Sequence, residues 1–349
     1  MFRLKFLIGA ALAAACGAAS AQTASDFAQL PGVFNPTLSA DGRYLAVGCQ
    51  APDRSRICLY DLDGGGDMEL FGVPKPMTLD HFYFAGPQHL FVRGRFMEGV
   101  EIGAEVEDRE FRRALVFNLE AGTATPFMEN FGGFDNTQVA SLNRDDPDTV
   151  LAEITMRVGG GDQTGSQLRT DERLESVLFE VDLDTGEGRR IDQGRMWGRI
   201  FRPDGEVTAH ILFDPETSDY ELRRVENGRQ TLYEGEHQFD APAVRGFDAE
   251  GGYVLVFPEG PLRGVRRLDP QTGAMTALTQ ETDGRIFNPI VDPHTDIVVG
   301  LQRYDDDLPS QAFFDEQLAG DASALAGALQ VGRVTLESWS QDRDRVVFS

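Results

Sequence analysis

The sequence predicts an all-β fold: a β-propeller of about six to seven four-stranded blades, with the last blade incomplete and one short inserted helix. Three observations predict it. Short β-branched and aromatic runs are separated by Gly and Pro throughout the chain. A tight-turn motif recurs every ~43 to 59 residues, close to the period of a propeller blade. A second, strand-like unit follows most copies of that motif.

The recurring turn contains an acidic residue next to glycine and is followed directly by a strand-like run. It is clearest at residues 39–42 (SADG), 202–205 (RPDG) and 248–251 (DAEG). Asp and Gly suit the positive φ angles of tight turns. Weaker copies occur at residues 86–88, 145–148, 292–295 and 341–344. The copies predict six blades and the opening strand of a seventh.

The second unit predicts the outer half of each blade. It combines an apolar strand with an acidic or Gly-containing hairpin turn, and it occurs at residues 56–64, 115–122, 178–186 and 265–273. We interpret it as a third strand, a hairpin turn and the start of an outer fourth strand. Each repeat is therefore a four-stranded antiparallel sheet.

Two segments near the end of the sequence depart from the repeat. Residues 313–329 are rich in Ala and Leu at helical spacing and predict an amphipathic helix inserted in the sixth blade. The sequence stops at Ser349, where the seventh blade has one predicted strand. Since a propeller avoids exposed edges by closing its ring, either residues 27–34 supply missing strands or the chain is truncated. We expect truncation.

The first 21 residues have the pattern of a secretory signal peptide. Arg3 and Lys5 precede an apolar run over residues 6–15, and residues 19–21 (ASA) predict cleavage between Ala21 and Gln22. The expected organisation is a signal peptide at 1–21 and a propeller at 22–349, without a transmembrane segment after processing. We expect a periplasmic or secreted protein. A lipoprotein anchored through Cys16 is the alternative.

Charge and cysteine content limit the function classes further. The formal net charge of −25 argues against nucleic acid as a partner, because an acidic surface repels phosphate groups. Cys49 and Cys58 remain after processing and lie in consecutive apolar segments. If these form a hairpin, the two residues can face each other, and an oxidising compartment favours a disulfide. Two buried thiols are the alternative.

We find no pattern of residues that predicts catalysis, a metal site or a bound cofactor. Ser166, Ser323, Ser338 and Ser340 lack the flanking glycines of a nucleophile elbow. The five histidines are scattered over different blades, which is typical of ordinary surface or core residues: His81, His89, His210, His237 and His294.

Two stretches of the sequence resemble exported members of the prolyl oligopeptidase family of serine peptidases. These are residues 26–31 (DFAQLP) with 36–46 (PTLSADGRYLA), and residues 313–315 (FFD) with 338–342 (SWSQD). The resemblance implies a propeller that admits short peptides to an α/β-hydrolase domain carrying the catalytic Ser, Asp and His. This sequence ends before any of those residues, so none is carried over.

These observations leave two functional hypotheses. The first is a non-catalytic, substrate-gating propeller of a periplasmic serine peptidase, whose partners are a C-terminal hydrolase domain or a peptide substrate. The alternative is a stand-alone periplasmic propeller that acts as a binding or scaffold module.

Overall fold

The computed structural model describes the greater part of the chain from residue 33 onward. The described residues are 33–51, 54–65, 68–102, 105–131, 135–158, 173–225, 230–238, 241–260, 262–279, 288–305 and 308–349. The predicted signal peptide, its cleavage site between Ala21 and Gln22, Cys16, and residues 27–32 lie outside them.

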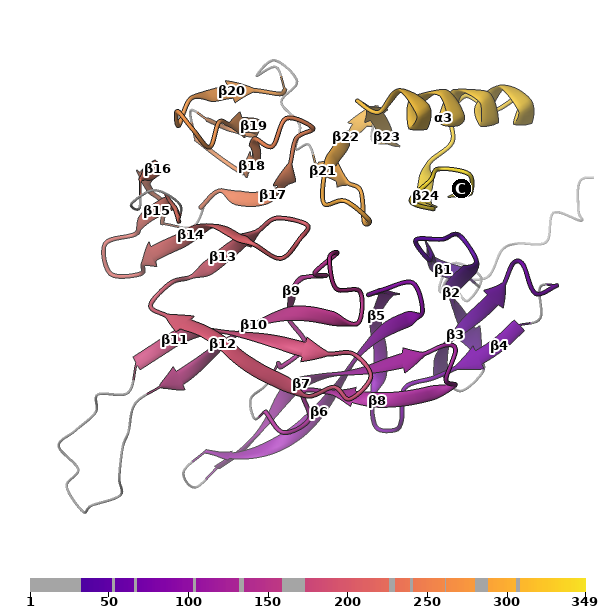
Figure 1. Ribbon diagram of the computed structural model, residues 1–349, viewed down its shortest axis with the longest axis horizontal. Coiled ribbons are helices and arrows are strands. Elements are labelled where there is room, and N and C mark those ends of the chain that lie inside the picture. Colours follow the sequence, from indigo (N-terminus) through magenta and orange to yellow (C-terminus); the bar gives the residue numbers. More distant parts are fainter. Residues whose placement is uncertain are drawn as a thin grey trace, which may run out of the picture.

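The described residues form a six-bladed β-propeller of mostly four-stranded sheets with one short helix, which confirms the predicted fold. Neighbouring strands are antiparallel and follow the order of the chain outward in every blade (Figure 1). The blades are, in turn, β1 (Val33–Leu38), β2 (Tyr44–Ala51), β3 (Arg54–Asp61) and β4 (Met68–Phe71); β5 (Thr78–Phe84), β6 (His89–Ile102), β7 (Glu105–Asn118) and β8 (Thr123–Phe127); β9 (Val139–Ser141), β10 (Thr149–Val158), β11 (Arg173–Asp182) and β12 (Gly188–Gly194); β13 (Gly198–Phe201), β14 (Val207–Asp214), β15 (Asp219–Arg224) and β16 (Thr231–Glu236); β17 (Ala243–Phe247), β18 (Tyr253–Phe257), β19 (Gly264–Leu268) and β20 (Met275–Ala277); and β21 (Asn288–Val291), β22 (Val298–Asp305) and β23 (Leu308–Phe313).

A two-stranded sheet of β24 (Leu336–Trp339) and β25 (Val346–Phe348) lies between the sixth blade and the first. The sequence predicted one opening strand here, at residues 345–348. In the structure the recurring turn joins the first and second strands of a sheet, so the predicted strand is the second one and β24 precedes it.

The recurring turn has the backbone geometry that its residues suggest. Gly42, Gly205 and Gly251 have φ angles of 71°, 85° and 82°. The acidic side chain also stabilises the turn, as when the Asp41 carboxylate accepts a hydrogen bond of 3.0 Å from the Arg43 N–H. Arg343 occupies the same place in the last turn with a φ of 66°, although it is not a glycine.

The innermost pair of strands in each described sheet contains a register shift. The shift occurs between β1 and β2, and again in the six equivalent pairs. Because a β-bulge bends a strand and redirects its side chains, these irregularities shape the surface of the central channel.

The hydrophobic core consists of layers between neighbouring sheets. One layer packs Phe91 and Phe127 of the second blade against Val177 and Phe179 of the third. Similar layers join the first blade to the second, the fourth to the fifth and the fifth to the sixth. Each blade therefore depends on its neighbour for the burial of its apolar face.

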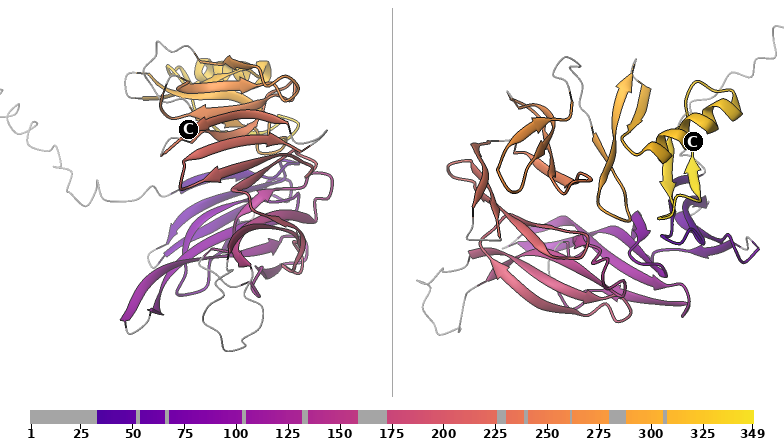
Figure 2. Two further views of the ribbon diagram at one scale, coloured as in Figure 1. Left: turned by 90° about the vertical axis from the view of Figure 1, so that its left-hand side faces the viewer. Right: turned by 45° about the horizontal axis from the view of Figure 1, so that its top comes forward.

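The first blade and the β24–β25 sheet lie side by side (Figure 2). The Leu38 N–H donates to the Ser338 hydroxyl at 2.9 Å, and the Gln341 N–H donates to the Ala40 carbonyl at 2.8 Å. β1 is nevertheless hydrogen-bonded to β2 of its own blade, so residues 33–34 supply no strand to the last sheet.

The predicted helix is present as α3 (Glu316–Leu329), which begins three residues later than expected. The Asp315 side chain caps it by accepting a hydrogen bond of 2.9 Å from the Leu318 N–H. Leu318 is buried against β24, whereas Phe314 lies before the helix and is exposed. α3 follows β23, where the complete blades have their fourth strand. Within the described residues, no helix is long and apolar enough to cross a membrane.

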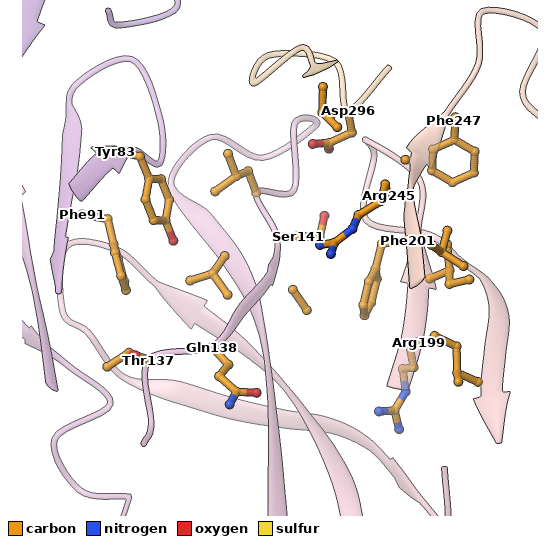
Figure 3. Close-up of a pocket in the computed structure, with 18 of the residues that line it drawn as sticks. Tyr83, Phe91, Thr137, Gln138, Ser141, Arg199, Phe201, Arg245, Phe247 and Asp296 are labelled. Carbon is orange, nitrogen blue, oxygen red and sulfur yellow. The ribbon is translucent and has the colours of Figure 1, made fainter. Parts of the chain in front are cut away.

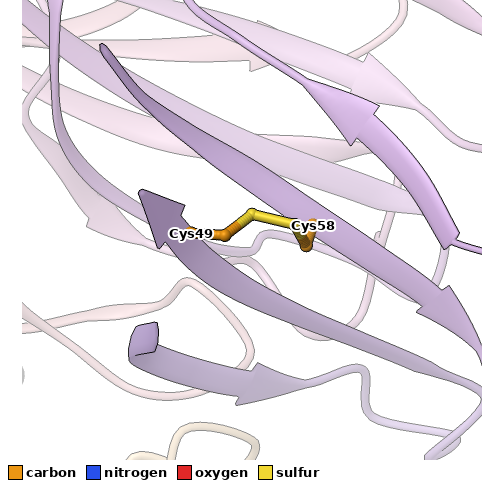
Figure 4. Close-up of a disulfide and its surroundings, with 2 residues drawn as sticks. All are labelled: Cys49 and Cys58. Atoms are coloured by element: carbon orange, nitrogen blue, oxygen red, sulfur yellow. A yellow bond between two sulfur atoms is a disulfide. The ribbon is translucent and has the colours of Figure 1, made fainter. Parts of the chain in front are cut away.

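A disulfide joins Cys49 of β2 to Cys58 of β3 (Figure 4). The two cysteines are diagonal neighbours in the ladder, since Cys49 lies opposite Arg56 and Cys58 lies opposite Val47. Their Cα atoms are 6.0 Å apart, within the usual range for a disulfide. The bond links the two central strands of the first blade, which is the blade beside the β24–β25 sheet.

Replacing both cysteines by alanine is expected to lower the free energy of unfolding by about 2–3 kcal/mol, because the bond restricts a short loop of the unfolded chain. Urea unfolding of the oxidised wild type and of the Cys49→Ala/Cys58→Ala variant measures the difference. The wild type in the presence of a reductant should unfold near the variant. Equal midpoints for the oxidised and reduced wild type would contradict a stabilising disulfide.

Candidate functional site

A cavity of about 570 Å³ lies in the central channel (Figure 3). Its walls come mainly from the first strands of the second to fifth blades, with the sixth blade adding the end of β21 and the following turn. Aromatic and aliphatic side chains form much of the lining, and Figure 3 shows Tyr83 and Phe91 on one side with Phe201 and Phe247 on the other. Segments distant in the sequence thus form one site.

Three arginines line the cavity, and they differ in their partners. Arg93 forms an ion pair of 2.8 Å with Asp80. Arg199 is fully buried and contacts two carboxylates of the third blade. Arg245 is exposed to the cavity and has no ion pair or hydrogen bond within the described part of the chain. One of the three positive charges is therefore free to bind a ligand.

The backbone of β17 accounts for the direction of the Arg245 side chain. Val244 pairs with Leu255 and Gly246 pairs with Val254, so Arg245 is the extra residue of a bulge. Gly246 has a φ of 141°, and a Cβ atom there would lie 2.6 Å from the Asp296 carbonyl oxygen. The Phe247 N–H donates to that same oxygen at 3.2 Å. The bulge is thus held between the fifth blade and the turn of the sixth.

Uncharged polar groups complete the lining. The Tyr83 hydroxyl and the Gln138 amide have no hydrogen-bond partner among the described residues, and both can bond to a ligand. Burial raises the pKa of Tyr83, so its hydroxyl stays protonated and can donate. Asp296 provides one lining carboxyl, and burial raises its pKa despite the opposing effect of Arg144.

The recurring turns narrow one end of the channel. The Arg144 guanidinium, from the turn of the third blade, donates to the Pro293 carbonyl in the turn of the sixth. Burial lowers the pKa of Arg144. A smaller cavity of about 140 Å³ lies at this end, against Arg144, His294 and Gln341. Trp197 precedes β13 and therefore lies toward the opposite end, with an exposed ring packed edge-on against Phe213.

The structure places the histidines at separate points of the fold. His81 and His89 are on β5 and β6, His210 is on β14, His237 follows β16, and His294 is in the turn before β22. His89 is buried and contacts Asp184 of the third blade at 3.0 Å. Where the structure describes the chain, it contains no group of three or more His, Cys, Asp or Glu residues able to hold a metal ion.

Two of the serines that lack the flanking glycines of a nucleophile elbow, Ser338 and Ser340, form hydrogen bonds that stabilise the fold. Ser338 accepts a hydrogen bond from the first blade, and Ser340 donates to Asp342 at 2.6 Å within the last turn. Ser39 and Asp41 form the same contact at 2.5 Å in the first turn. The pairing of Ser340 with Asp342 is therefore a repeated feature of the turns. Ser166 lies outside the described residues.

No motif in the sequence marks Arg245 as a site residue. The segment 243–247 (AVRGF) lacks the alternation of a half-buried strand, and the glycine after Arg245 is the one local signal of a bulge. The direction of the side chain depends on contacts with the sixth blade, about fifty residues later in the chain.

No family model and no curated protein matches the sequence. Solved structures match distantly, and among them are propeller domains of peptidases of the prolyl oligopeptidase family. Puromycin hydrolase is 15% identical with a TM-score of 0.46, and the match covers 79% of this chain and 44% of that one. Acylaminoacyl peptidase from Pyrococcus horikoshii is 12% identical with a TM-score of 0.43, covering 84% and 46%.

TolB from Acinetobacter baumannii is 14% identical with a TM-score of 0.34, and the match covers 80% of this chain and 54% of that one. The chain thus spans less than half the length of the two peptidases and about half the length of TolB. At these identities, the matches concern the fold alone.

Proposed function

We propose that this chain is a non-catalytic propeller that binds short peptides in its central channel, as the substrate-gating part of a periplasmic serine peptidase. The observation that carries the proposal is the channel cavity, which combines aromatic walls with polar groups and a guanidinium that have no partner in the described parts of the chain. Catalysis belongs, in this proposal, to a hydrolase domain of the kind implied by the sequence resemblance.

The size of the cavity supports a small or extended ligand. Pockets of about 300–1,000 Å³ hold drug-sized molecules, and the channel cavity of about 570 Å³ falls within that range. A peptide of a few residues has a similar size. A folded protein does not fit, so the cavity favours short or unstructured chains.

The chemistry of the lining supports a peptide in particular. A peptide has backbone donors and acceptors at every residue, and it needs partners for them once it leaves water. Tyr83 and Gln138 offer such partners, while Phe91, Phe201 and Phe247 offer apolar surface for side chains. Because Arg144 obstructs the end of the channel near the recurring turns, the peptide enters from the end near Trp197.

Filling the cavity is expected to abolish binding. Ala140 is the extra residue of the β9 bulge and is exposed in the cavity, so the Ala140→Trp substitution adds a large side chain there without burying it in the core. The probe is a tetrapeptide of sequence AFAA with free ends, measured by isothermal titration calorimetry. We expect the variant to bind it at least ten times more weakly than the wild type.

The Ala324→Trp substitution, at an exposed position of α3, is the matched control and should leave binding unchanged. Equal affinities of the wild type and the Ala140→Trp variant for the tetrapeptide would place the binding site elsewhere and contradict the proposal. Cleavage of the tetrapeptide by the purified chain, lost on treatment with a serine-directed inhibitor, would contradict its non-catalytic part.

A further inference from the structure

We infer that Arg245 is a specificity residue, and that the channel selects peptides that present a carboxylate to its guanidinium. This inference rests on the proposed function, since it names the chemical class of peptide that the same cavity takes. Two sources of the carboxylate are possible in a peptide: its C-terminus and an acidic side chain. Both have the planar geometry that a guanidinium binds through two parallel hydrogen bonds.

The charges around the cavity support this selection. The protein as a whole is strongly acidic, with a formal net charge of −25. The cavity nevertheless has three arginines and one carboxyl among its lining residues. Asp80 neutralises Arg93, and Glu153 with Asp192 neutralises Arg199. Among the residues that the structure describes, none compensates the positive charge of Arg245, which a carboxylate ligand would neutralise.

The position of Arg245 allows its guanidinium to form an ion pair with a ligand inside the cavity. The side chain comes from the bulge of β17 and points into the cavity, between the Tyr83 side and the Phe201 side (Figure 3). Surrounding apolar groups reduce the local screening by water, so an ion pair formed there is stronger than one on the surface. The Gly246 contact with the sixth blade fixes the backbone that carries Arg245, which limits the ordering needed on binding.

The other polar groups of the cavity are compatible with a carboxylate. The protonated Tyr83 hydroxyl and the Gln138 amide can both donate to it. Asp296 is the one lining group that would repel a carboxylate. Asp296 interacts electrostatically with Arg144, Asp292 and His294 at the obstructed end of the channel, and Arg245 has no resolved effect on its pKa. Asp296 therefore leaves the guanidinium of Arg245 available.

The test compares three tetrapeptides by calorimetry: AFAA with a free C-terminal carboxylate, AFAA as its C-terminal amide, and AFAE as its C-terminal amide. We expect a free carboxylate to improve binding to the wild type by about tenfold over AFAA amide, as charge-assisted hydrogen bonds do. If the channel selects a C-terminal carboxylate, only AFAA acid should bind more tightly than AFAA amide. If it selects an acidic side chain, only AFAE amide should do so. The Arg245→Gln variant should lose this discrimination, so its affinities for the three peptides should agree within about twofold.

The Arg333→Gln variant removes an exposed arginine that does not line the cavity, and it should keep the discrimination of the wild type. If AFAA amide binds as well as both carboxylate peptides, or if Arg245→Gln keeps the discrimination, the inference is wrong while the peptide-binding proposal stands. If none of the three peptides binds to the wild type, the proposed function fails and the inference fails with it.

Discussion

The Arg199→Leu substitution is expected to lower the free energy of unfolding by about 3–5 kcal/mol, because it leaves a partly buried carboxylate without its partner. Arg199 begins the fourth blade with a side chain that is 0% exposed. Its Nη1 lies 2.5 Å from Glu153 Oε1 and its Nη2 lies 2.9 Å from Asp192 Oδ2. Urea unfolding of the variant and the wild type measures the loss.

Two further variants separate the buried contact from a general effect of charge. Arg202→Leu removes an arginine that is about half exposed and pairs with Glu206 at 3.2 Å, and it should cost less than about 0.5 kcal/mol. In Arg199→Leu/Glu153→Leu both partners are apolar, so part of the lost stability should return. An Arg199→Leu variant as stable as Arg202→Leu would contradict this account of the contact between the third and fourth blades.

The Arg343→Gly substitution is expected to lower the free energy of unfolding by about 2–4 kcal/mol, although glycine suits the backbone better at this position. Arg343 has a φ of 66°, and its Nη2 lies 2.6 Å from Asp292 Oδ2. The Asp292 side chain is 1% exposed, so the variant leaves a buried carboxylate unpaired. Arg343 thus combines a strained backbone conformation with an ion pair that joins the β24–β25 sheet to the sixth blade.

The effect of Arg343→Gly should depend on pH in a defined direction. Burial raises the pKa of the Asp292 carboxyl, but Arg343 and the His294 N–H more than reverse this, and the pKa is below the usual 3.8. In the wild type, the ionised carboxylate therefore contributes stability above that value, and this is lost as pH falls through the lowered pKa. Without Arg343, burial raises the pKa of the Asp292 carboxyl, so that carboxyl is protonated at a higher pH than in the wild type.

Thermal unfolding of both proteins between pH 7 and pH 4 tests this dependence. Burial also lowers the pKa of His294, so both proteins lose some stability below pH 6.5. Arg343 lowers that pKa as well, so the variant should lose less stability there than the wild type, which also reduces the difference between the two proteins. We expect the difference to shrink as pH falls. Arg343→Gly/Asp292→Asn should recover part of the loss at pH 7, since its amide needs no countercharge. A constant difference across the pH range would contradict the role of Asp292.

The repeating features of the fold could be predicted from the sequence because they are local. Asp41 and Gly42 mark a turn through their own backbone preferences, and the same signal recurs at residues 204–205. The helix was predictable from the spacing of Leu318 and Leu325, which both pack against the layer under α3. Such signals need no knowledge of the rest of the chain.

The last sheet and the channel could not be predicted in the same way. β24 (Leu336–Trp339) was missed because four residues give too short a pattern to identify a strand. Arg343 stands where the three clearest turns have glycine, and it forms an ion pair with Asp292, about fifty residues earlier in the chain. The cavity is lined by five blades, so its lining depends on how separate sheets pack rather than on any local motif.

The central claim is that a peptide lies in the channel, and photo-crosslinking tests it most directly. The probe is the AFAA tetrapeptide with benzoylphenylalanine in place of its phenylalanine, irradiated with the purified protein and followed by mass spectrometry of the digested complex. We predict crosslinks within residues 137–142 and within β17, which contribute residues of the third and fifth blades to the cavity lining. Crosslinks confined to outer strands such as β4 or β8, undiminished in the Ala140→Trp variant, would contradict the claim.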